Sequence, residues 1–236
     1  MNQHRRRFFV VAGAVIAAAA LPFAARSAAR MKIGIIGSGN VGSALGGVWV
    51  KAGHEVMFSS RHIEHDRSLA AGLGAGARAG TPREAAAFGD VLLVAVPYGA
   101  LPDVGKDLAD LIKDKVVIDA CNPFPNRDGE IADWALEKGA GLASAELLPG
   151  ARVVRAFNAV GAARMGSVHK EPGVVGMPIA GDDAEAVAVA SSLIREIGFE
   201  PVLVGGLAMG KYLMPRTPLA GERSAEEIRQ IAAGLE

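Results

Sequence analysis

Three glycines have the spacing of a dinucleotide-binding loop. Gly37, Gly39 and Gly42 lie in the sequence GSGNVG, between an apolar run over 33–36 and a helical pattern over 41–52. A strand, a turn and a helix in this order present free backbone N–H groups to a pyrophosphate. Gly37 permits the tight turn, Gly39 lets the backbone approach the anion, and Gly42 lets the helix pack on the strand. The predicted pyrophosphate loop consists of Gly37, Ser38, Gly39, Asn40, Val41 and Gly42.

The end of the next strand, predicted over 55–59, indicates which dinucleotide binds. Sites for NAD usually place a carboxylate here, which accepts hydrogen bonds from the ribose hydroxyls. This chain instead has Ser59, Ser60 and Arg61, which offer hydroxyl donors and a cation to a 2′-phosphate. His62 and His65 can add further phosphate contacts. The nearest acidic residues begin the strand or lie beyond its end, so the segment predicts NADP(H); the alternative is a mildly basic surface loop.

The first 30 residues differ in character from the rest. Three arginines at 5–7 precede an uncharged stretch over 8–25, with small residues at 25 and 27–29. This order is typical of a secretory signal peptide, and the arginine pair resembles a twin-arginine signal, which exports folded proteins. The stretch is too short and too rich in alanine for a membrane span, so we expect no stable span after cleavage. We therefore predict a periplasmic or otherwise exported protein; the alternative is a cytoplasmic protein whose translation starts at Met31.

Composition and charge narrow the class of protein. Five arginines precede residue 31, which leaves 20 basic and 25 acidic residues and a net charge of about −5 in 31–236. We therefore expect no nucleic-acid partner. Cys121 is the only cysteine, which excludes an intrachain disulfide, and we predict no metal site. Half of the residues are hydrophobic and no repeat or Pro/Ser-rich linker divides 31–236, so we treat this part as one domain.

Apolar runs of strand length alternate with amphipathic stretches of helix length. This alternation predicts an α/β fold, with a doubly wound, mainly parallel Rossmann-type sheet in three layers, αβα. The strands are predicted at Lys32–Ile36, Glu55–Ser59, near Arg78, and at Val91–Val96, Val116–Asp119, Arg152–Ala156, Val174–Ala180 and Glu200–Val204. The helices are predicted at Val41–Ala52, Glu64–Leu73, Pro82–Phe88, Leu101–Ile112, Ala143–Leu148, Ala184–Ile197 and Ala225–Ala233. The last helix packs either on a second subunit, which would give a homodimer, or on the sheet of its own chain.

Loops after the strands are the places to seek chemistry, because ligands of open parallel sheets bind at the carboxyl ends of the strands. Pro97 follows the fourth predicted strand, and it fixes the backbone where a nicotinamide would rest. Asn158 follows the sixth, and it offers a donor and an acceptor to the carboxamide or to a second ring. Pro97 and Asn158 are therefore our candidates for the reacting centre, with a loop-capping role as the alternative. Asn122 precedes a proline and is a weaker candidate, because Asn-Pro commonly begins turns.

Several motifs together resemble one family, the deazaflavin-dependent NADP oxidoreductases, whose deazaflavin is coenzyme F420. The likeness extends over essentially all of 31–236, and the same module is similar to the NADPH-oxidising domain of the six-transmembrane metalloreductases of the STEAP type. The glycine loop is shared with many enzymes, whereas the other motifs are more specific in combination. These motifs are GSGNVG at 37–42, FSSR at 58–61, VAVP at 94–97, VVRAFN at 153–158, AGDD at 180–183, and the segment from GGL at 205–207 to LMP at 213–215.

The resemblance implies hydride transfer between NADPH and a second flat, electron-carrying ring, which is a deazaflavin or a flavin. It also implies that the glycine loop, Ser60 and Arg61 bind the cofactor. Pro97 and Asn158 would then lie near the nicotinamide. Two departures stand out. His65 replaces a lysine that often follows the arginine, and a signal peptide is unusual in a family that is mostly cytoplasmic.

The polar residues available also favour transfer between stacked rings. Reduction of an imine or a keto acid needs a placed acid, and no convincing one is found, whereas ring-to-ring hydride transfer needs mainly distance and orientation. Related dehydrogenases complete their sites with a helical second domain, but only residues 205–236 follow the last predicted strand. We therefore predict an enzyme whose partner is a small-molecule redox acceptor. The alternative is a non-catalytic NADP(H)-binding redox sensor or scavenger.

Overall fold

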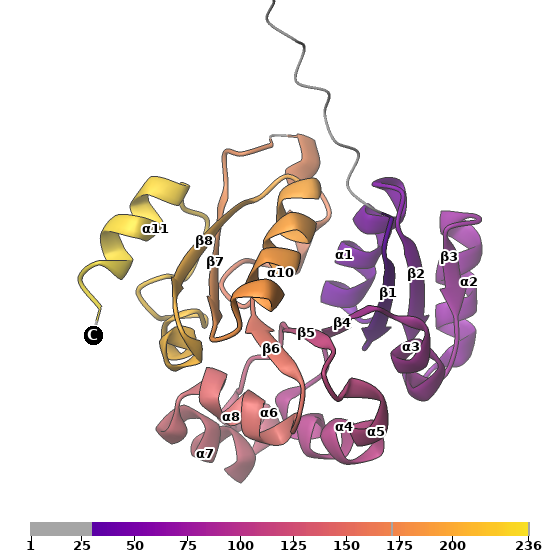
Figure 1. Ribbon diagram of the computed structural model, residues 1–236, viewed down its shortest axis with the longest axis horizontal. Helices are drawn as coiled ribbons and strands as arrows, with labels where there is room; N and C mark the ends of the chain where they lie inside the picture. Colours follow the sequence, from indigo (N-terminus) through magenta and orange to yellow (C-terminus); the bar gives the residue numbers. More distant parts are fainter. Residues whose placement is uncertain (1–29, 171, 236) are drawn as a thin grey trace, which may run out of the picture.

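Eight strands form one sheet in the order β3-β2-β1-β4-β5-β6-β7-β8 (Figure 1). The structure is a computed structural model that describes residues 30–170 and 172–235. Every neighbouring pair of strands is parallel except β6 and β7, which are antiparallel. The strands are β1 Lys32–Ile36, β2 Glu55–Ser59, β3 Ala77–Ala79, β4 Val91–Val94, β5 Val116–Asp119, β6 Arg152–Arg155, β7 Gly176–Gly181 and β8 Glu200–Gly205. This arrangement confirms the predicted α/β fold with a mainly parallel, doubly wound sheet.

The strand order reverses beside β1, and this position determines where a ligand can bind. β1 pairs with β2 on one side, where Ile36 lies opposite Ser59, and with β4 on the other, where Ile36 lies opposite Val94. The connections after β1 and β4 therefore leave the sheet in opposite directions and open a crevice at the carboxyl ends of these strands.

Helices cover both faces of the sheet, because successive side chains of a strand point to opposite faces. Val91 and Leu93 of β4 pack in the cluster that includes α1 and α10, whereas Leu92 and Val94 pack in the cluster that includes α3, α4 and α8. The helices are α1 Asn40–Lys51, α2 Ile63–Leu73, α3 Pro82–Phe88, α4 Leu101–Asp107, α5 Ala109–Ile112, α6 Pro125–Asp128, α7 Glu130–Lys138, α8 Ala140–Leu147, α9 Ala162–Met165, α10 Ala184–Glu196 and α11 Ala225–Ala232. Short 3₁₀ turns lie at η1 Tyr98–Ala100, η2 Val168–Lys170 and η3 Leu207–Tyr212.

Two predicted helices differ from those of the structure. The helix predicted over 101–112 is divided at Leu108, which is buried and leaves helical geometry with φ −113° and ψ 10°. The carbonyl of Asp107 accepts instead from the Arg83 guanidinium at 2.5 Å. The helix predicted over 143–148 begins earlier, at Ala140, and the amphipathic helix α7 before it was not predicted.

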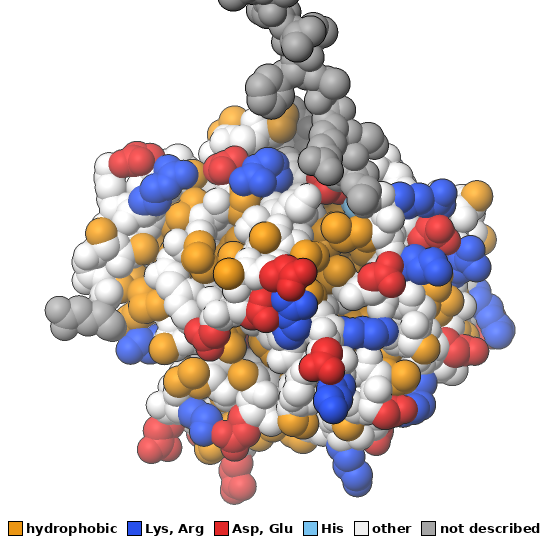
Figure 2. Space-filling model, in the orientation of Figure 1, with side chains coloured by type: hydrophobic (Ala, Val, Ile, Leu, Met, Phe, Trp, Pro, Cys, Tyr) orange, Lys and Arg blue, Asp and Glu red, His pale blue; other side chains and the backbone are white. Residues whose placement is uncertain are grey.

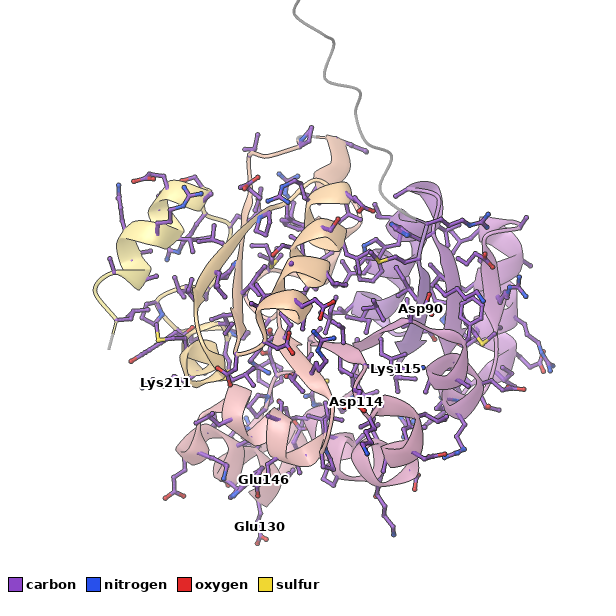
Figure 3. The ribbon with its side chains drawn as sticks, in the orientation of Figure 1. Asp90, Asp114, Lys115, Glu130, Glu146 and Lys211 are labelled. Atoms are coloured by element: carbon purple, nitrogen blue, oxygen red, sulfur yellow. The ribbon has the colours of Figure 1, made fainter. Side chains whose placement is uncertain are left out.

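Buried aromatic rings and side-chain caps fix the main layers. Trp49 of α1 donates its ring N–H to the carbonyl of Leu193 in α10 at 3.0 Å, and it meets the Phe157 ring edge-on at 6.1 Å between centroids. Phe157 in turn packs edge-on against Phe199. On the other face, the Lys115 ammonium donates to the carbonyls of Ala86 and Gly89 at the end of α3, and burial lowers its pKa (Figure 3). These buried contacts hold the helices on both faces of the sheet, and the Phe157 ring anchors the loop after β6 among them.

The C-terminal helix α11 packs on the sheet of its own chain. Ile228 is buried against Val202 of β8 and Leu219, and α11 lies beside the outer strands β7 and β8 (Figure 1). Its role in a homodimer stays a prediction. Acidic and basic side chains are interspersed over the face drawn in Figure 2. Across the described ranges no helix has both the length and the apolar character that crossing a bilayer requires. The predicted signal peptide, residues 1–30, lies outside the described residues except for Arg30.

Candidate functional site

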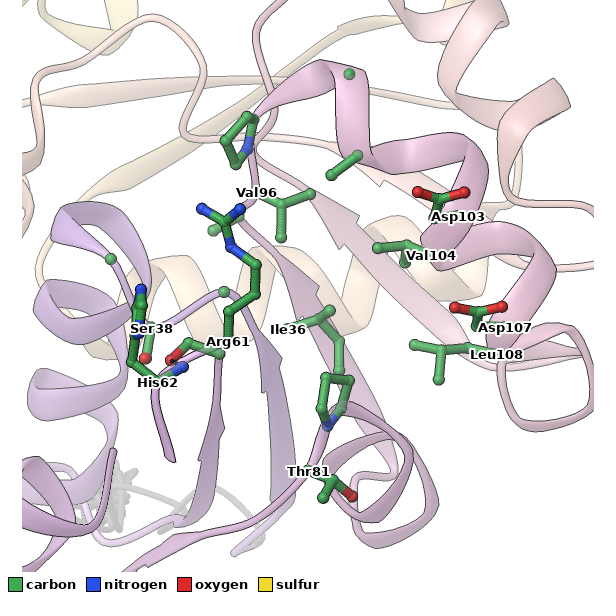
Figure 4. A pocket seen from close by; sticks show the side chains of 18 of the residues that line it. Ile36, Ser38, Arg61, His62, Thr81, Val96, Asp103, Val104, Asp107 and Leu108 are labelled. Atoms are coloured by element: carbon green, nitrogen blue, oxygen red, sulfur yellow. Dashed lines mark hydrogen bonds between the residues drawn. The ribbon is translucent and has the colours of Figure 1, made fainter. Parts of the chain in front are cut away.

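A cleft of about 1420 Å³ opens at the reversal of strand order, between the loops after β1, β2 and β4 (Figure 4). One wall comes from the glycine loop and the loop after β2, and the opposite wall comes from α4. Figure 4 shows Ser38, Arg61 and His62 on the first wall and Asp103, Val104 and Asp107 on the second. The cleft therefore lies where an open parallel sheet binds its ligand.

The three glycines of the loop meet different surroundings. Gly37 has φ +103°, and a Cβ there would lie 2.5 Å from the Ala95 carbonyl oxygen, so the turn requires glycine. A Cβ on Gly42 would lie 2.1 Å from the Gly37 carbonyl oxygen, because α1 begins directly against its own loop. A Cβ on Gly39 would meet no atom within 4 Å. The loop thus leaves open space at Gly39, where α1 begins without a side-chain cap and can offer its first N–H groups to an anion.

The predicted phosphate contacts are only partly brought together. Arg61 and His65 line the cleft, and so does His62. Ser59 does not reach it: its hydroxyl is fully buried and donates to the Ile35 carbonyl at 2.6 Å, and its own carbonyl accepts from the N–H groups of Gly37 and Ser38. The prediction that Ser59 offers its hydroxyl to a phosphate is therefore wrong in this structure, because the last side chain of β2 points into the protein. Ser59 instead holds the glycine loop.

Asp66 is a residue of the site that was not predicted from the sequence. Its carboxylate is fully buried and accepts from the hydroxyls of both Ser38 and Ser60. The spacing of Asp66, Ala70 and Leu73 puts them on one face of α2, and this pattern could have shown that Asp66 points inward. Asp66 thus links the glycine loop to the loop after β2.

An apolar slot continues the cleft away from the glycine loop. Ile36, Pro82, Val104 and Leu108 line it, and Figure 4 shows Val104 and Leu108 directed from α4 and the α4–α5 junction toward Ile36. Arg83 also lines the cleft, and it forms two hydrogen bonds with the Asp110 carboxylate, at 3.0 and 2.7 Å. The slot has the apolar walls that a flat aromatic ring requires.

A second cavity of about 230 Å³ adjoins the first, since both are lined by Ala95, Val96, Pro97 and Arg127. Asn40 and Val41 of the glycine loop face this second cavity, together with Asn122 and Phe124. The Arg127 guanidinium lies over the Phe124 ring, 5.0 Å from its centroid, and the Asp128 carboxylate holds it at 2.8 and 2.9 Å. Among its described lining residues, arginine is the only ionisable type.

Asn158 does not line the second cavity, but it contacts Asn122, which does. Its side chain is 2% exposed, and its Nδ2 donates to the Cys121 carbonyl at 3.2 Å. Its Oδ1 is buried and has no hydrogen-bond partner, which is uncommon for a buried polar atom. The preceding residue, Phe157, has φ +69°, a left-handed conformation that costs free energy in a bulky residue. Strain beside an unpaired buried acceptor is more typical of a functional site than of a simple loop cap.

A buried arginine holds the loops on which Asn122 and Asn158 lie. Arg155 is fully buried; it donates to the Asp119 carboxylate at 2.5 Å and to the Asn122 side-chain oxygen at 3.1 Å. Asn122 then donates its amide to the Asn158 carbonyl at 2.9 Å. Cys121, between these residues, is buried, and burial raises the pKa of its thiol, so it is not a ready nucleophile. Among the described residues, no three His, Cys, Asp or Glu side chains are grouped so that they could hold a metal ion.

The fold, the glycine loop and the cleft together define a dinucleotide-binding protein of the Rossmann class. Residues 32–123 match the family described as NADP oxidoreductase coenzyme F420-dependent. The chain is 31% identical over 203 residues to F420-dependent NADP reductase from Methanothermobacter thermautotrophicus, covering 80% of this chain and 87% of that protein. The chain belongs to this family of NADP-dependent oxidoreductases, and NADP(H) is its cofactor. Coenzyme F420 is the second cofactor that the family name implies.

Two further similarities extend this result. The chain is 31% identical over 183 residues to Metalloreductase STEAP3 from Rattus norvegicus, which covers 76% of this chain but only 35% of that longer protein. A hypothetical protein from Sinorhizobium meliloti has a solved structure with a TM-score of 0.69 and 28% identity, over 83% of this chain and 95% of that one. The predicted family and cofactor are therefore confirmed, whereas the site residues other than Ser59 stay predictions.

Proposed function

We propose that this protein transfers a hydride between NADPH and a planar acceptor of the deazaflavin or flavin type. The observation that carries the proposal is the second cavity beside Pro97, which is walled by Asn122 and Phe124. Asn122 is hydrogen-bonded to the backbone carbonyl of Asn158, whose side-chain Oδ1 is buried and unpaired. Its described lining holds no Asp, Glu or His that could protonate a product. Hydride transfer between two stacked rings needs no such acid, so the composition of the cavity favours it.

Each part of NADP(H) has residues of suitable chemistry in the cleft. The open space at Gly39 suits the pyrophosphate, Arg61 with His62 and His65 suits the 2′-phosphate, and the apolar slot suits the adenine. The nicotinamide then extends past Pro97 toward the second cavity. When bound, NADPH supplies the hydride; the protein supplies position and the exclusion of water.

Asn158 is the residue that we propose orients the nicotinamide or the acceptor ring. Its amide nitrogen is fixed by the Cys121 carbonyl, so the amide oxygen is held in one direction as an acceptor. A ligand N–H group that reached it would satisfy a buried atom that has no partner in the free protein. The strained backbone at Phe157 keeps the loop in the conformation that holds this acceptor.

A non-catalytic NADP(H)-binding sensor or scavenger is the second candidate. The second cavity, about 230 Å³, favours this candidate, because the space beside Pro97 for an acceptor is small compared with the main cleft. For catalysis, an acceptor ring must stack from the open side of this cavity. The proposed location is the periplasm or another exported site, reached by a twin-arginine signal; a cytoplasmic protein that starts at Met31 is the alternative.

An acceptor panel tests the proposal. Anaerobic NADPH oxidation, followed by absorbance, is measured with deazaflavin, FAD, FMN, quinones and ferric chelates. Asn158→Leu should lower turnover at least about tenfold while the affinity for NADPH changes little, because pyrophosphate and phosphate contacts set affinity. The matched control is Asn126→Leu, which alters an exposed asparagine that lines neither cavity. If no acceptor supports oxidation and NADPH still binds, the sensor or scavenger replaces the enzyme.

A further inference from the structure

The carboxylate of Asp66 lies one hydrogen bond behind the wall of the cleft. One oxygen accepts from the Ser38 hydroxyl and the other accepts from the Ser60 hydroxyl at 2.9 Å. Both serines line the cleft beside Arg61, while Asp66 itself is fully buried. A single carboxylate therefore lies directly beneath the two loops that face the phosphates.

Counting protons shows what these serines can offer a ligand. A serine hydroxyl carries one proton, and a carboxylate can only accept. Ser38 and Ser60 both give their protons to Asp66, and the Ser60 oxygen also accepts from the His62 backbone N–H at 3.0 Å. Neither hydroxyl has a proton left for the cleft, whereas a phosphate needs donors. While it donates to Asp66, Ser60 does not act as the phosphate donor that its place in the sequence indicates.

The charges on the cleft wall show what must select the phosphate instead. Arg61, His62 and His65 line the cleft near Asp66, whereas the Arg83 guanidinium is held by Asp110. The buried Asp66 charge opposes a second negative charge nearby, and a low local dielectric strengthens this effect.

We propose that Asp66 sets the selectivity of this site for the 2′-phosphate. Its carboxylate links the glycine loop to the loop after β2 and accepts the hydroxyl protons of both serines. It also places one negative charge on the protein side of the proposed phosphate position. Discrimination between NADPH and NADH therefore rests on Arg61 and the histidines and is smaller than the serines would otherwise allow. The inference rests on the proposed location of the 2′-phosphate beside Arg61.

The direct test replaces the charge and keeps the shape. In Asp66→Asn, the amide must donate to one serine, and that hydroxyl is then free to turn its proton toward the cleft. We expect the ratio of NADH to NADPH dissociation constants to rise by at least about threefold, as for the loss of one nearby charge. Asp133→Asn removes the same charge from an exposed position on α7 and should leave the ratio unchanged. A ratio that stays equal or falls in Asp66→Asn would overturn the proposal.

A second variant decides the matter if Asp66→Asn does not fold. Ser60→Ala should weaken NADPH and NADH together and keep their ratio within about twofold, because its proton never reaches the phosphate. A selective tenfold loss of NADPH affinity in Ser60→Ala would show that Ser60 donates to the phosphate and would refute the inference. Arg61→Ala tests the location of the phosphate separately: if it leaves the ratio unchanged, that location is wrong, rather than only the role of Asp66.

Discussion

Replacing Gly39 by alanine should separate the stability of the fold from the affinity for NADPH. Gly39 has φ −69° and ψ −159°, which alanine adopts freely, and a Cβ there meets no atom within 4 Å. The free energy of unfolding should change by less than about 0.5 kcal/mol, because the lower entropy of the unfolded chain offsets a slightly poorer helix start. The added methyl group, however, fills the space proposed for the pyrophosphate. Loss of one charged hydrogen bond costs about 1.5–3 kcal/mol, so NADPH should bind roughly 10- to 150-fold more weakly.

The assay combines thermal or urea unfolding with NADPH titration by fluorescence. Gly37→Ala is the contrasting variant, because φ +103° and a Cβ 2.5 Å from the Ala95 carbonyl should destabilise the protein by at least about 1 kcal/mol. Gly72→Ala is the matched control: its Cβ also meets nothing within 4 Å, but it lies on α2 and outside the cleft. Full NADPH affinity in a stably folded Gly39→Ala protein would refute the pyrophosphate location.

Three further outcomes are expected. Arg61→Ala should remove roughly 10- to 150-fold of the preference for NADPH over NADH, measured by competitive titration, and equal wild-type affinities for the two would contradict it. The Arg152 guanidinium, 2.7 Å away, holds the pKa of Asp183 well below its usual range, so this pair stabilises the fold above the unfolded pKa of about 4 and loses its effect as pH falls through the folded value. Urea unfolding should therefore show wild type more stable than Asp183→Asn at pH 7, with the difference shrinking below about pH 4; a difference that does not depend on pH would count against the ion pair. Replacing both arginines of the proposed signal, Arg6→Lys with Arg7→Lys, should leave the precursor in the cytoplasm on fractionation, and unchanged export would exclude the twin-arginine route.

The sheet could be predicted closely because its signals are local. β1, β2 and β5 have the predicted bounds, since each is an apolar run that ends at a glycine turn, a polar residue or a loop. The break at Leu108 could not be predicted, because it depends on Arg83, which reaches the Asp107 carbonyl from a distant helix. Helix α7 had a detectable signal in Ile131, Trp134 and Ala135, spaced for one helical face.

The site was predictable in its residue types but not in their directions. Arg61 and Pro97 line the cleft, as expected of residues that follow the strands. Ser59 and Ser60 are adjacent in sequence, but one is the last residue of β2 and the other begins the loop, so their hydroxyls go to different partners. Asn158 lies behind the wall because the strained turn at Phe157 carries it inward, and strain of this kind leaves no trace in composition or spacing.

The buried Arg155 has a consequence for how the molecule opens. Besides Asp119 and Asn122, its guanidinium donates to the carbonyl of Gly210, in the 3₁₀ turn that follows the last strand. If residues 207–212 detach, the cation loses one of its acceptors while still enclosed, which is costly. The tail and the loop after β5 should therefore exchange their amide hydrogens as one cooperative unit, although they are far apart in the sequence. Truncation beyond the last strand would then loosen the end of the cleft proposed for the nicotinamide without touching any residue that lines it.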